Sequence, residues 1–123
     1  AHYLDAFVIP IAKKNLPAYR KVAKMAGKVW MDHGALAYVE SVGDDLKPGF
    51  GLPFPKLCKL SPGQTVLFSY IFYKSRAHRD RVNKAVMSDP RMAKFAKSMP
   101  AARVLFWADS ANLLTWFAQY LTS

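Results

Sequence analysis

The sequence predicts an α+β fold in which two helices cover one face of a four-stranded antiparallel sheet. Strand-like and helix-like patterns follow one another in the order strand, helix, strand, long loop, strand, helix, strand. Apolar residues make up 52% of the chain, which is typical of a globular rather than a disordered protein. A length of 123 residues suits one domain with a substantial core. We therefore expect a single domain over residues 1–123.

The central stretch of the chain is a predicted strand followed directly by a charged helix. Residues 66–73 (VLFSYIFY) are apolar on both alternating faces, which indicates a strand covered on both sides. Ser75 is expected to cap the helix, because its hydroxyl can accept a hydrogen bond from an unpaired amide of the first turn. The helix is expected from Arg76 to about Met87, ending before Asp89-Pro90, with a short helical run after it. Its predicted inward stripe is Ala77, Val82, Ala85 and Val86, and its predicted charge pairs are Arg76 with Asp80 and Asp80 with Lys84.

The first strand is predicted over Tyr3–Ile9 and is expected to end at Pro10. Asp5 is its one charged residue, and it shares a face of the strand with apolar side chains. A carboxylate that is buried without a partner is strongly destabilising. Asp5 is therefore expected either to have a partner or to lie at an edge.

The first helix follows this strand. Asn15 can cap it, Pro17 is tolerated in its first turn, and apolar residues keep helical spacing through His33. Gly34 then supplies the C-terminal stop. We expect Trp30 to belong to the core rather than to a cofactor platform. His33 is expected to interact with the C-terminal end of the helix rather than to bind a ligand.

The remaining segments are two strands, a loop and a tail. Residues 35–42 (ALAYVESV) form the second predicted strand, and Glu40 is an acidic residue on its apolar face. Residues 43–63 are rich in Pro and Gly and form a long loop, which is commonly a lid or an interface arm; its apolar side chains are expected to pack on something. The fourth strand is predicted over 103–108. The C-terminal extension over 111–123 has apolar residues at helical spacing and no Lys or Arg, so we expect it to dock on a partner rather than on a membrane.

This order of elements is the split βαβ arrangement of ferredoxin-like folds, βαββαβ. Two helices cover one face of such a sheet. The other face also carries large apolar side chains here, and monomeric proteins rarely expose a large apolar patch. We therefore predict a homodimer formed through the sheet face.

The formal net charge of +10 raises nucleic acid, acidic ligands and anionic membranes as partners. The basic residues are spread over the predicted helices, so solvated helix faces explain them without a specific nucleic acid. No apolar run approaches the roughly 20 residues of a membrane-spanning helix, and we expect no signal peptide. The single cysteine, Cys58, cannot form an internal disulfide. We expect a cytoplasmic protein that does not bind membranes.

His78 lies in the first turn of the second long helix, close to the predicted inward stripe. The positive end of the helix dipole disfavours the imidazolium ion, so the ring is expected to stay neutral. A neutral imidazole that faces a cavity can accept a proton or bind a ligand. The alternative is a half-buried histidine that is hydrogen-bonded to the backbone. The spacing of the histidines and Cys58 does not match a zinc site.

The segments YLDAFVIP, HGALAYVESVGDD, SYIFYKSRAHRDRVNKAVMSDPRM and KSMP together resemble DUF1428, or YbaA-like, an uncharacterised family of small bacterial proteins. The resemblance covers residues 3–107 and implies a dimeric α+β barrel, in which ferredoxin-like subunits pair through their sheets. The sequence departs from the family after the fourth strand, where residues 108–110 stand in place of a glycine pair and an aromatic. The positions that match the family motif are Asp5, Ser75, Arg76, His78, Arg79, Asp80, Asn83, Asp89, Pro90 and Arg91.

The wider superfamily of dimeric α+β barrels implies a pocket between sheet and helices. It includes cofactor-free monooxygenases, haem-degrading and haem-binding enzymes, and isomerases. In an enzyme, His78 would be the catalytic base or a ligand, and Arg79 or Asn83 would orient a carbonyl or an anion. Asn83 projects from a different side of the helix, which argues against one pocket holding both it and His78. The candidate ligand-binding residues are Arg76, Arg79, Asn83, Trp30, Tyr70 and Asp5.

Several functions stay open. The first is a small-molecule-binding homodimer without catalysis, which the lack of a tight catalytic constellation favours. The second is a cofactor-free monooxygenase or an isomerase. The third is weak RNA binding through charge and aromatic residues, although the aromatic signature of RNA-recognition sheets is missing. We expect no cofactor and no metal.

Overall fold

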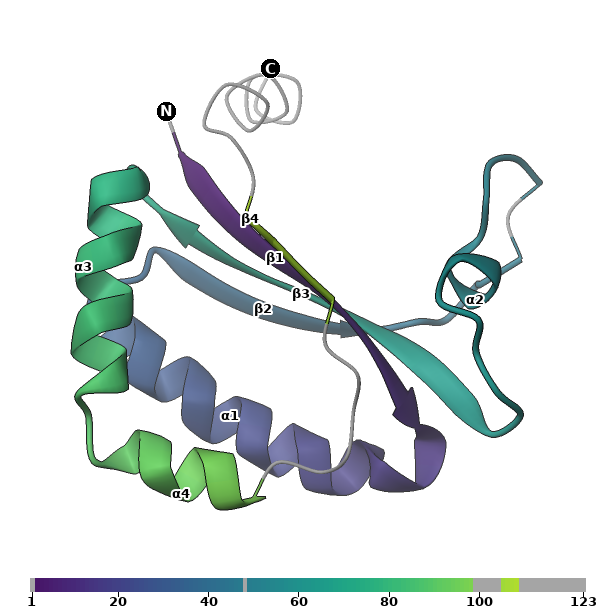
Figure 1. Cartoon of the computed structure of the whole chain (residues 1–123), viewed down its shortest axis with the longest axis horizontal. Helices are drawn as coiled ribbons and strands as arrows, with labels where there is room; N and C mark the ends of the chain where they lie inside the picture. The colour runs from purple at the N-terminus through teal and green to yellow at the C-terminus, as the bar shows by residue number, and fades with distance from the viewer. Residues whose placement is uncertain (1, 48, 99–104, 109–123) are drawn as a thin grey trace.

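The computed structural model describes residues 2–47, 49–98 and 105–108, and the predicted extension over 111–123 lies outside them. Within the described residues the chain forms an α+β fold around an antiparallel sheet, which confirms the predicted class (Figure 1). The strands lie in the order β2-β3-β1-β4, so β1 pairs with β3 on one side and with β4 on the other. Their bounds are β1 Tyr3–Ala12, β2 Ala37–Val42, β3 Gln64–Tyr73 and β4 Leu105–Ala108.

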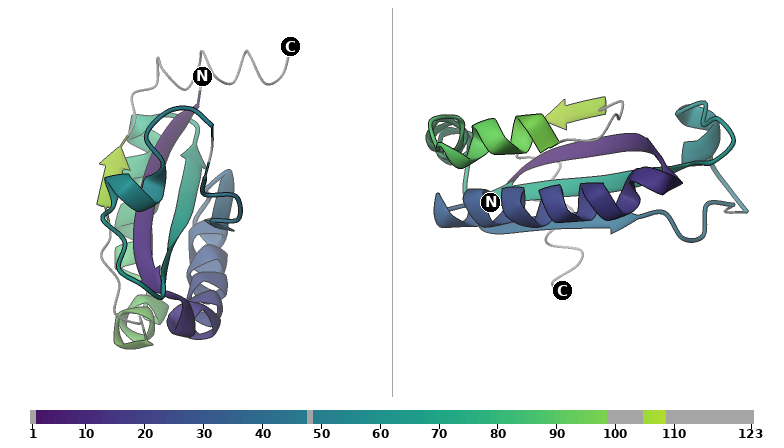
Figure 2. Two further views of the ribbon diagram at one scale, coloured as in Figure 1. Left: turned by 90° about the vertical axis from the view of Figure 1, so that its right-hand side faces the viewer. Right: turned by 90° about the horizontal axis from the view of Figure 1, so that it is seen from below.

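Three longer helices pack on one side of this sheet, and a fourth, short helix projects past its end (Figures 1 and 2). The packed helices are α1 (Leu16–Asp32), α3 (Arg76–Met87) and α4 (Arg91–Ser98). The short helix, α2 (Phe54–Leu57), lies within the predicted long loop. None of the helices in the described residues is long and apolar enough to cross a bilayer.

β1 continues past Pro10 to Ala12, so the predicted end of this strand is wrong. A proline has no N–H to donate to a neighbouring strand. The described residues of β4 pair with β1 only over residues 5–8, so Pro10 lies beyond that pairing. A proline is tolerated where one side of a strand is unpaired. Ile11 then adds a fully buried side chain to the core, 1% exposed.

α1 starts where the sequence predicts, but Asn15 does not cap it. A short 3-10 turn, η1 (Lys13–Asn15), precedes the helix and holds Asn15 in a helical backbone conformation, so its side chain makes no capping hydrogen bond. Gly34 ends the helix as predicted, with a φ of +105° that favours glycine. β2 then begins later than expected, at Ala37.

α3 begins as predicted, because the Ser75 hydroxyl accepts the backbone N–H of His78 at 3.1 Å. Val82 and Val86 are buried, whereas Ala77 is exposed and does not belong to the inward stripe. Ala77 precedes Val82 by five residues, which places it about 140° away around the helix. The prediction of an inward Ala77 was therefore wrong.

The predicted charge pairs on α3 are replaced by a different one. Asp80 accepts a hydrogen bond at 2.7 Å from Nε of Arg79, the residue beside it, instead of pairing with Arg76 or Lys84. Arg79 is only 14% exposed in its side chain, and it also reaches the sheet. Asp80 therefore helps to hold a half-buried cation, which outweighs a weak exposed pair along the helix.

The two faces of the sheet differ in what covers them. On the helix side, β1 and β3 contribute buried residues to clusters that include Val29 of α1 and Val82 and Val86 of α3. On the open side, Phe68, Tyr70 and Phe72 form a row along β3, with neighbouring ring centroids 6.0 and 5.3 Å apart. These three rings are half-buried in the single chain.

The long loop partly packs on this open side. The ring of Phe54 in α2 stacks on Phe68 with centroids 6.4 Å apart. Phe50 and Leu52, by contrast, are 87% and 65% exposed. The expectation that the apolar side chains of the loop pack on something is therefore met by Phe54 but not by these two residues within the described chain.

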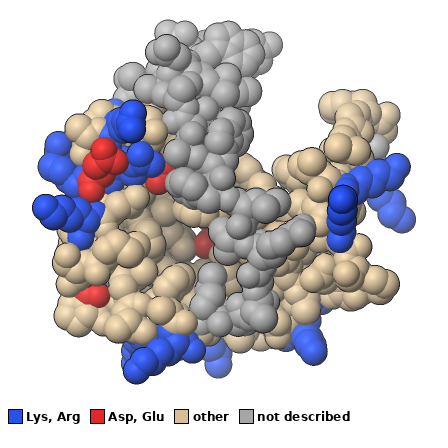
Figure 3. Space-filling model, in the orientation of Figure 1, with Lys and Arg blue, Asp and Glu red and all other residues tan. Residues whose placement is uncertain are grey.

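Basic side chains gather at several separate places in the view of Figure 3 rather than in one patch. They lie over different elements, which agrees with the spread expected from the sequence. This surface does not present the single basic stripe that marks many nucleic-acid-binding domains.

Candidate functional site

A cavity of about 340 Å³ lies between the sheet and the helices. The three paired strands β1, β2 and β3 line one side of it, and α1, α3 and α4 line the other. Most of the lining is apolar or aromatic, with polar groups from several elements. The lining residues are Asp5, Phe7, Ile9, Tyr19, Trp30, Tyr38, Glu40, Ser69, Ile71, Tyr73, Asn83, Met87 and Phe95. We call this space the inner cavity.

Asp5 is a buried carboxylate in the wall of the inner cavity, 2% exposed. Nη1 of Arg79 donates to its Oδ1 at 2.7 Å, so the partner that the sequence demanded is present. Burial raises the pKa of Asp5, while Arg79 and a hydrogen bond from Asn83 oppose that rise. The guanidinium of Arg79 also lies over the ring of Tyr3, 5.0 Å from its centroid.

Asn83 connects this ion pair to the aromatic part of the cavity wall. Its Oδ1 accepts the indole N–H of Trp30 and the hydroxyl of Tyr73, both at 3.1 Å. Its amide is hydrogen-bonded to Asp5. Burial, and then the charge of Asp5, raise the pKa of Tyr73, so this phenol stays protonated and keeps donating. In the described residues, no buried side-chain N or O atom is left without a hydrogen-bond partner.

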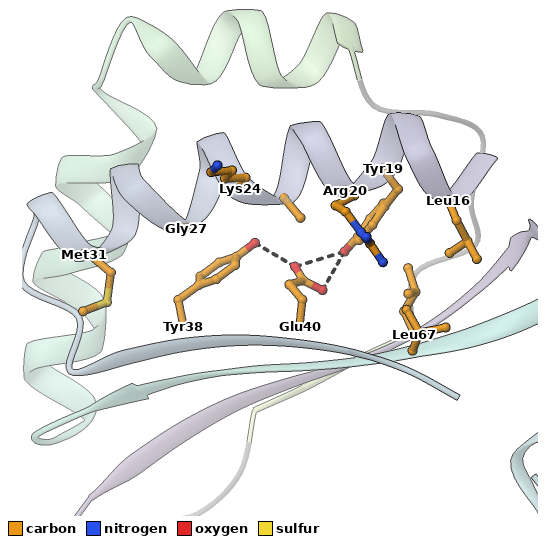
Figure 4. Close-up of a pocket in the computed structure, with 11 residues that line it drawn as sticks. Leu16, Tyr19, Arg20, Lys24, Gly27, Met31, Tyr38, Glu40 and Leu67 are labelled. Atoms are coloured by element: carbon orange, nitrogen blue, oxygen red, sulfur yellow. Dashed lines mark hydrogen bonds between the residues drawn. The ribbon is translucent and has the colours of Figure 1, made fainter. Parts of the chain in front are cut away.

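A second carboxylate, Glu40, is half-buried and lies on β2 at another part of the wall (Figure 4). It accepts hydrogen bonds from the hydroxyl of Tyr38 at 2.8 Å and from that of Tyr19 at 3.0 Å. The hydroxyl of Ser69, the residue of β3 that is paired with Glu40, also donates to it. Burial raises the pKa of Glu40, and the three hydroxyls oppose that rise. Burial and the nearby Glu40 raise the pKa of both tyrosines, so both remain hydrogen-bond donors.

A groove of about 490 Å³ lies between α1 and β2 on the other side of this cluster. Tyr19, Tyr38 and Glu40 line both the groove and the inner cavity, so they form the boundary between the two. In Figure 4 the three side chains bridge the space between α1 and the sheet, and Arg20 extends from α1 toward the sheet beside them. Lys24, one turn further along α1, also lines the groove.

Four of the predicted site residues come together in or beside the inner cavity. Asp5, Trp30 and Asn83 line it, and Arg79 holds Asp5 from the adjoining turn of α3. Trp30 also packs against the hydrophobic core, as expected.

His78 lies outside the lining of the inner cavity. Its Nδ1 accepts the backbone N–H of Lys74 at 2.9 Å, and the ring also has a hydrogen bond with the backbone of Gly34. Burial, and then the charges of Lys74 and Arg81, lower its pKa, which keeps the ring neutral. This geometry favours the backbone-bonded alternative over a catalytic base. The expectation that His78 and Asn83 occupy different sides of α3 agrees with the cavity lining.

Two other predicted site residues also lie elsewhere. Tyr70 belongs to the aromatic row on the open side of the sheet, so the prediction that it meets Trp30 and His78 was wrong. Arg76 is exposed in the first turn of α3 and does not line the inner cavity.

Asp89 and Arg91 of the family motif connect the turn between α3 and α4 to the end of α1. Asp89 accepts two hydrogen bonds from the side chain of Arg91, at 3.0 and 2.8 Å, and lies 2.8 Å from Nε2 of His33. Arg91 also donates to Asp32 of α1 at 2.8 Å. These contacts, with that of Arg91 as the first cause, lower the pKa of Asp89. His33 thus lies at the C-terminal end of α1, as predicted, and its ring contacts Asp89 between α3 and α4, a partner that the sequence did not indicate.

The tyrosines that surround Glu40, together with Ser69 and Tyr73, were not predicted to be site residues. Glu40 was identified as an acidic residue on an apolar strand face, and that was the available indication of a polar cluster. In the described chain, no group of three or more His, Cys, Asp or Glu side chains is arranged to hold a metal ion.

The chain is similar to several known proteins. Residues 2–103 match the DUF1428 family, a protein family of unknown function. The uncharacterised protein YbaA of Escherichia coli K12 is 38% identical over 98 residues, which are 80% of this chain and 84% of that protein; the YbaA protein of Shigella flexneri matches equally. Among solved structures, a putative antibiotic biosynthesis monooxygenase from Nitrosomonas europaea has a similar fold, with a TM-score of 0.53 at 11% identity over 89% of this chain and 91% of that one. The chain therefore belongs to the DUF1428 family.

Proposed function

We propose that this protein is a small-molecule-binding homodimer and that its ligand occupies the inner cavity. The observation that carries the proposal is a space of about 340 Å³ with a mostly apolar lining and converging polar groups from five elements, β1, β2, β3, α1 and α3. Ligand sites commonly have this size and this composition, with a few polar groups that fix the orientation of the ligand. The polar groups are already held in position by their own hydrogen bonds, so little ordering is needed when a ligand binds.

The lining defines the chemistry of the ligand part that fits inside. Phe7, Trp30, Tyr38 and Phe95 offer aromatic faces and edges, which suit an apolar or aromatic body. Asp5 and Glu40 are carboxylates in a poorly solvated space, so a second anion beside them is disfavoured. The mostly apolar lining makes the burial of a cation costly as well, so we expect an uncharged body inside the cavity. A hydroxyl or N–H on it can donate to Glu40, whose oxygens together have more acceptor positions than its three hydroxyl partners use.

An equilibrium titration with N-phenyl-1-naphthylamine, an uncharged aromatic fluorophore, tests this proposal. We expect saturable binding of one molecule per chain. Phe7→Trp puts a larger ring into the inner cavity and is expected to weaken binding by about tenfold or more. Phe72→Trp makes the same replacement on the open side of the sheet and is the matched control, with an expected change below about twofold. Equal effects of the two variants, or no saturable binding, would reject the cavity as the site.

The homodimer is supported by the open side of the sheet. The row of Phe68, Tyr70 and Phe72 is half-buried in one chain, and a second copy can cover it. We expect a dimer by light scattering at micromolar concentration. Phe72→Asp places a charge on this face and should produce a monomer, whereas Ala93→Asp, in the exposed first turn of α4, should not. A monomeric wild-type protein would contradict this part of the proposal.

Catalysis in the same cavity is the second candidate. Its support is Glu40, whose raised pKa makes its carboxylate a better proton acceptor, beside a space that suits an apolar substrate. The likeness in fold to a putative monooxygenase agrees with it. Both an isomerase and a cofactor-free oxygenase can begin by removing a proton from carbon next to a carbonyl. The test is deuterium uptake from D2O by 2-tetralone, an aromatic ketone. Catalysed exchange that Glu40→Gln abolishes would support an enzyme, and exchange at the uncatalysed rate would oppose it.

A further inference from the structure

The groove between α1 and β2 adjoins the inner cavity and has a different chemical character. It is larger, about 490 Å³, and two cations, Arg20 and Lys24, line it. The inner cavity has two carboxylates in its lining and neither of these cations. Tyr19, Tyr38 and Glu40 belong to both linings. A molecule that occupies both spaces therefore has to move the hydrogen-bonded side chains of Tyr19, Tyr38 and Glu40 apart, with cations on one side of them and a mostly apolar lining on the other.

We propose that the groove is a second subsite of the ligand site and binds the anionic end of an amphiphilic ligand whose uncharged body lies in the inner cavity. This inference rests on the proposed function and names the ligand class, an organic monoanion with an apolar or aromatic body. The charge of the ligand is thus separated from Asp5 and lies beside Arg20 and Lys24, while Glu40 at the boundary is hydrogen-bonded by Tyr19, Tyr38 and Ser69.

The two cations of the groove are available for such a ligand. In the part of the chain that the structure describes, neither Arg20 nor Lys24 forms a salt bridge, unlike Lys28, which pairs with Asp32 one turn on. They are four residues apart on α1, so they lie on the same face of the helix about one turn apart. An anionic group beside Arg20 can be held by the guanidinium, which offers two hydrogen bonds to carboxylate, sulfonate or phosphate oxygens, and Lys24 adds positive charge to the same groove.

The rest of the groove lining suits the start of an apolar body. Its apolar lining residues come from α1 and from two strands and are Leu16, Ala23, Met31, Val42 and Leu67. Gly27 lies opposite the Tyr38 ring, and a Cβ atom at this position would lie 2.9 Å from Cδ1 of that ring. The glycine therefore lets the boundary tyrosine approach α1 closely, which brings the groove against the hydroxyl cluster on Glu40.

A matched pair of fluorophores tests the inference on the full-length protein. 8-Anilinonaphthalene-1-sulfonate carries a sulfonate, and N-phenyl-1-naphthylamine is the same aromatic body without it. The Arg20→Gln/Lys24→Gln variant is expected to weaken binding of the sulfonate by about tenfold and binding of the neutral probe by less than about twofold. Lys14→Gln/Lys21→Gln removes the same net charge outside the groove lining and is the control, with changes below about twofold for both probes.

The outcomes separate the two proposals. Phe7→Trp should weaken both probes, since the aromatic body is common to them. The groove subsite would be overturned if the two double variants weakened sulfonate binding equally, or if Arg20→Gln/Lys24→Gln left it unchanged. Binding of the neutral probe would still support the inner cavity in either case. Neutral-probe binding that Phe7→Trp leaves unchanged would instead reject the inner cavity, and with it the proposed function.

Discussion

Replacement of Arg79 by Met is expected to destabilise the protein strongly at neutral pH. Arg79 is the ion-pair partner of Asp5, with 2.7 Å between Nη1 and Oδ1, and Asp5 is only 2% exposed. Met keeps most of the apolar stem but leaves the carboxylate buried without its cation. Breaking a buried ion pair from one side typically costs about 3–5 kcal/mol. Asn83 still bonds to Asp5, so we expect the lower end, about 3 kcal/mol.

The free energy of unfolding that is lost in Arg79→Met is expected to depend on pH. The folded-state pKa of Asp5 is already raised by burial, and Arg79 lowers it. Without Arg79 the folded pKa rises further above the unfolded value. A carboxyl with a raised folded pKa lowers the free energy of unfolding as pH rises through its unfolded pKa toward its folded pKa. Relative to the wild-type protein, the decrease in the free energy of unfolding of Arg79→Met should therefore be small near about pH 4 and should grow toward about pH 7.

Urea denaturation at fixed protein concentration measures these free energies. The double variant Arg79→Met/Asp5→Asn, which has no buried charge at this position, should be more stable at neutral pH than Arg79→Met alone, by about 1–2 kcal/mol. Suppose that the free energy of unfolding of Arg79→Met falls by less than about 1 kcal/mol and that this decrease is independent of pH. Asp5 would then be solvated in the folded protein, and its dependence on Arg79 would be refuted.

Other predictions concern the groove boundary and the start of α3. Burial raises the folded pKa of Glu40, so the free energy of unfolding of the wild-type protein should fall as pH rises above the ordinary carboxyl range. Glu40→Gln should reduce the dependence of this free energy on pH, as measured by urea denaturation. An unchanged pH dependence would contradict the burial of the carboxyl. Gly27→Ala brings a methyl group within 2.9 Å of the Tyr38 ring and should cost about 1–2 kcal/mol despite the better helix propensity of Ala. In a Tyr38→Leu background the same change should be neutral or stabilising, and an equal loss there would exclude this contact as the cause. Ser75→Ala removes the acceptor for the His78 N–H and should cost about 1 kcal/mol in thermal or urea denaturation, with Ser75→Thr close to wild type. Equal stability of the Ala variant would show that the cap contributes nothing.

The sequence predicted the order of the elements well, because each element has a local cause. Ser75 starts α3 through its own hydroxyl, and Gly34 ends α1 through a backbone conformation that other residues avoid. Asn15 failed as a cap because a short 3-10 turn before α1 already fixes its backbone in a helical conformation. A turn of three residues leaves little trace in hydrophobic spacing.

The site was harder to predict, since it depends on which face of each strand meets the helices. β3 is apolar on both faces, so its alternation does not distinguish them, and Tyr70 was placed on the wrong one. Ser69 takes the helix side because it lies opposite Glu40 on β2, a register that exists only after the strands pair. Asp5 and Glu40 were identified as acids in apolar strands, but most of their partners come from residues 19, 79 and 83, far away in sequence; residue 38 is two positions from Glu40.

The most conspicuous motif residues have structural roles in this fold. His78 connects the turn before α3 to the end of α1 through backbone bonds, and Asp89 with Arg91 fixes the turn between α3 and α4 against α1. A motif can thus mark the positions that hold helices in place. The cavity that these helices enclose is then lined by other residues.

The central claim is that this chain forms a dimer whose inner cavity holds a small molecule. Native mass spectrometry of protein purified gently from its own host tests it most directly, because one spectrum reports the number of chains and any retained ligand. We predict a dimer with one small adduct per chain, which added N-phenyl-1-naphthylamine displaces from the wild-type protein and which Phe7→Trp does not retain. A monomer, or an empty dimer that takes up none of the added fluorophore, would contradict it.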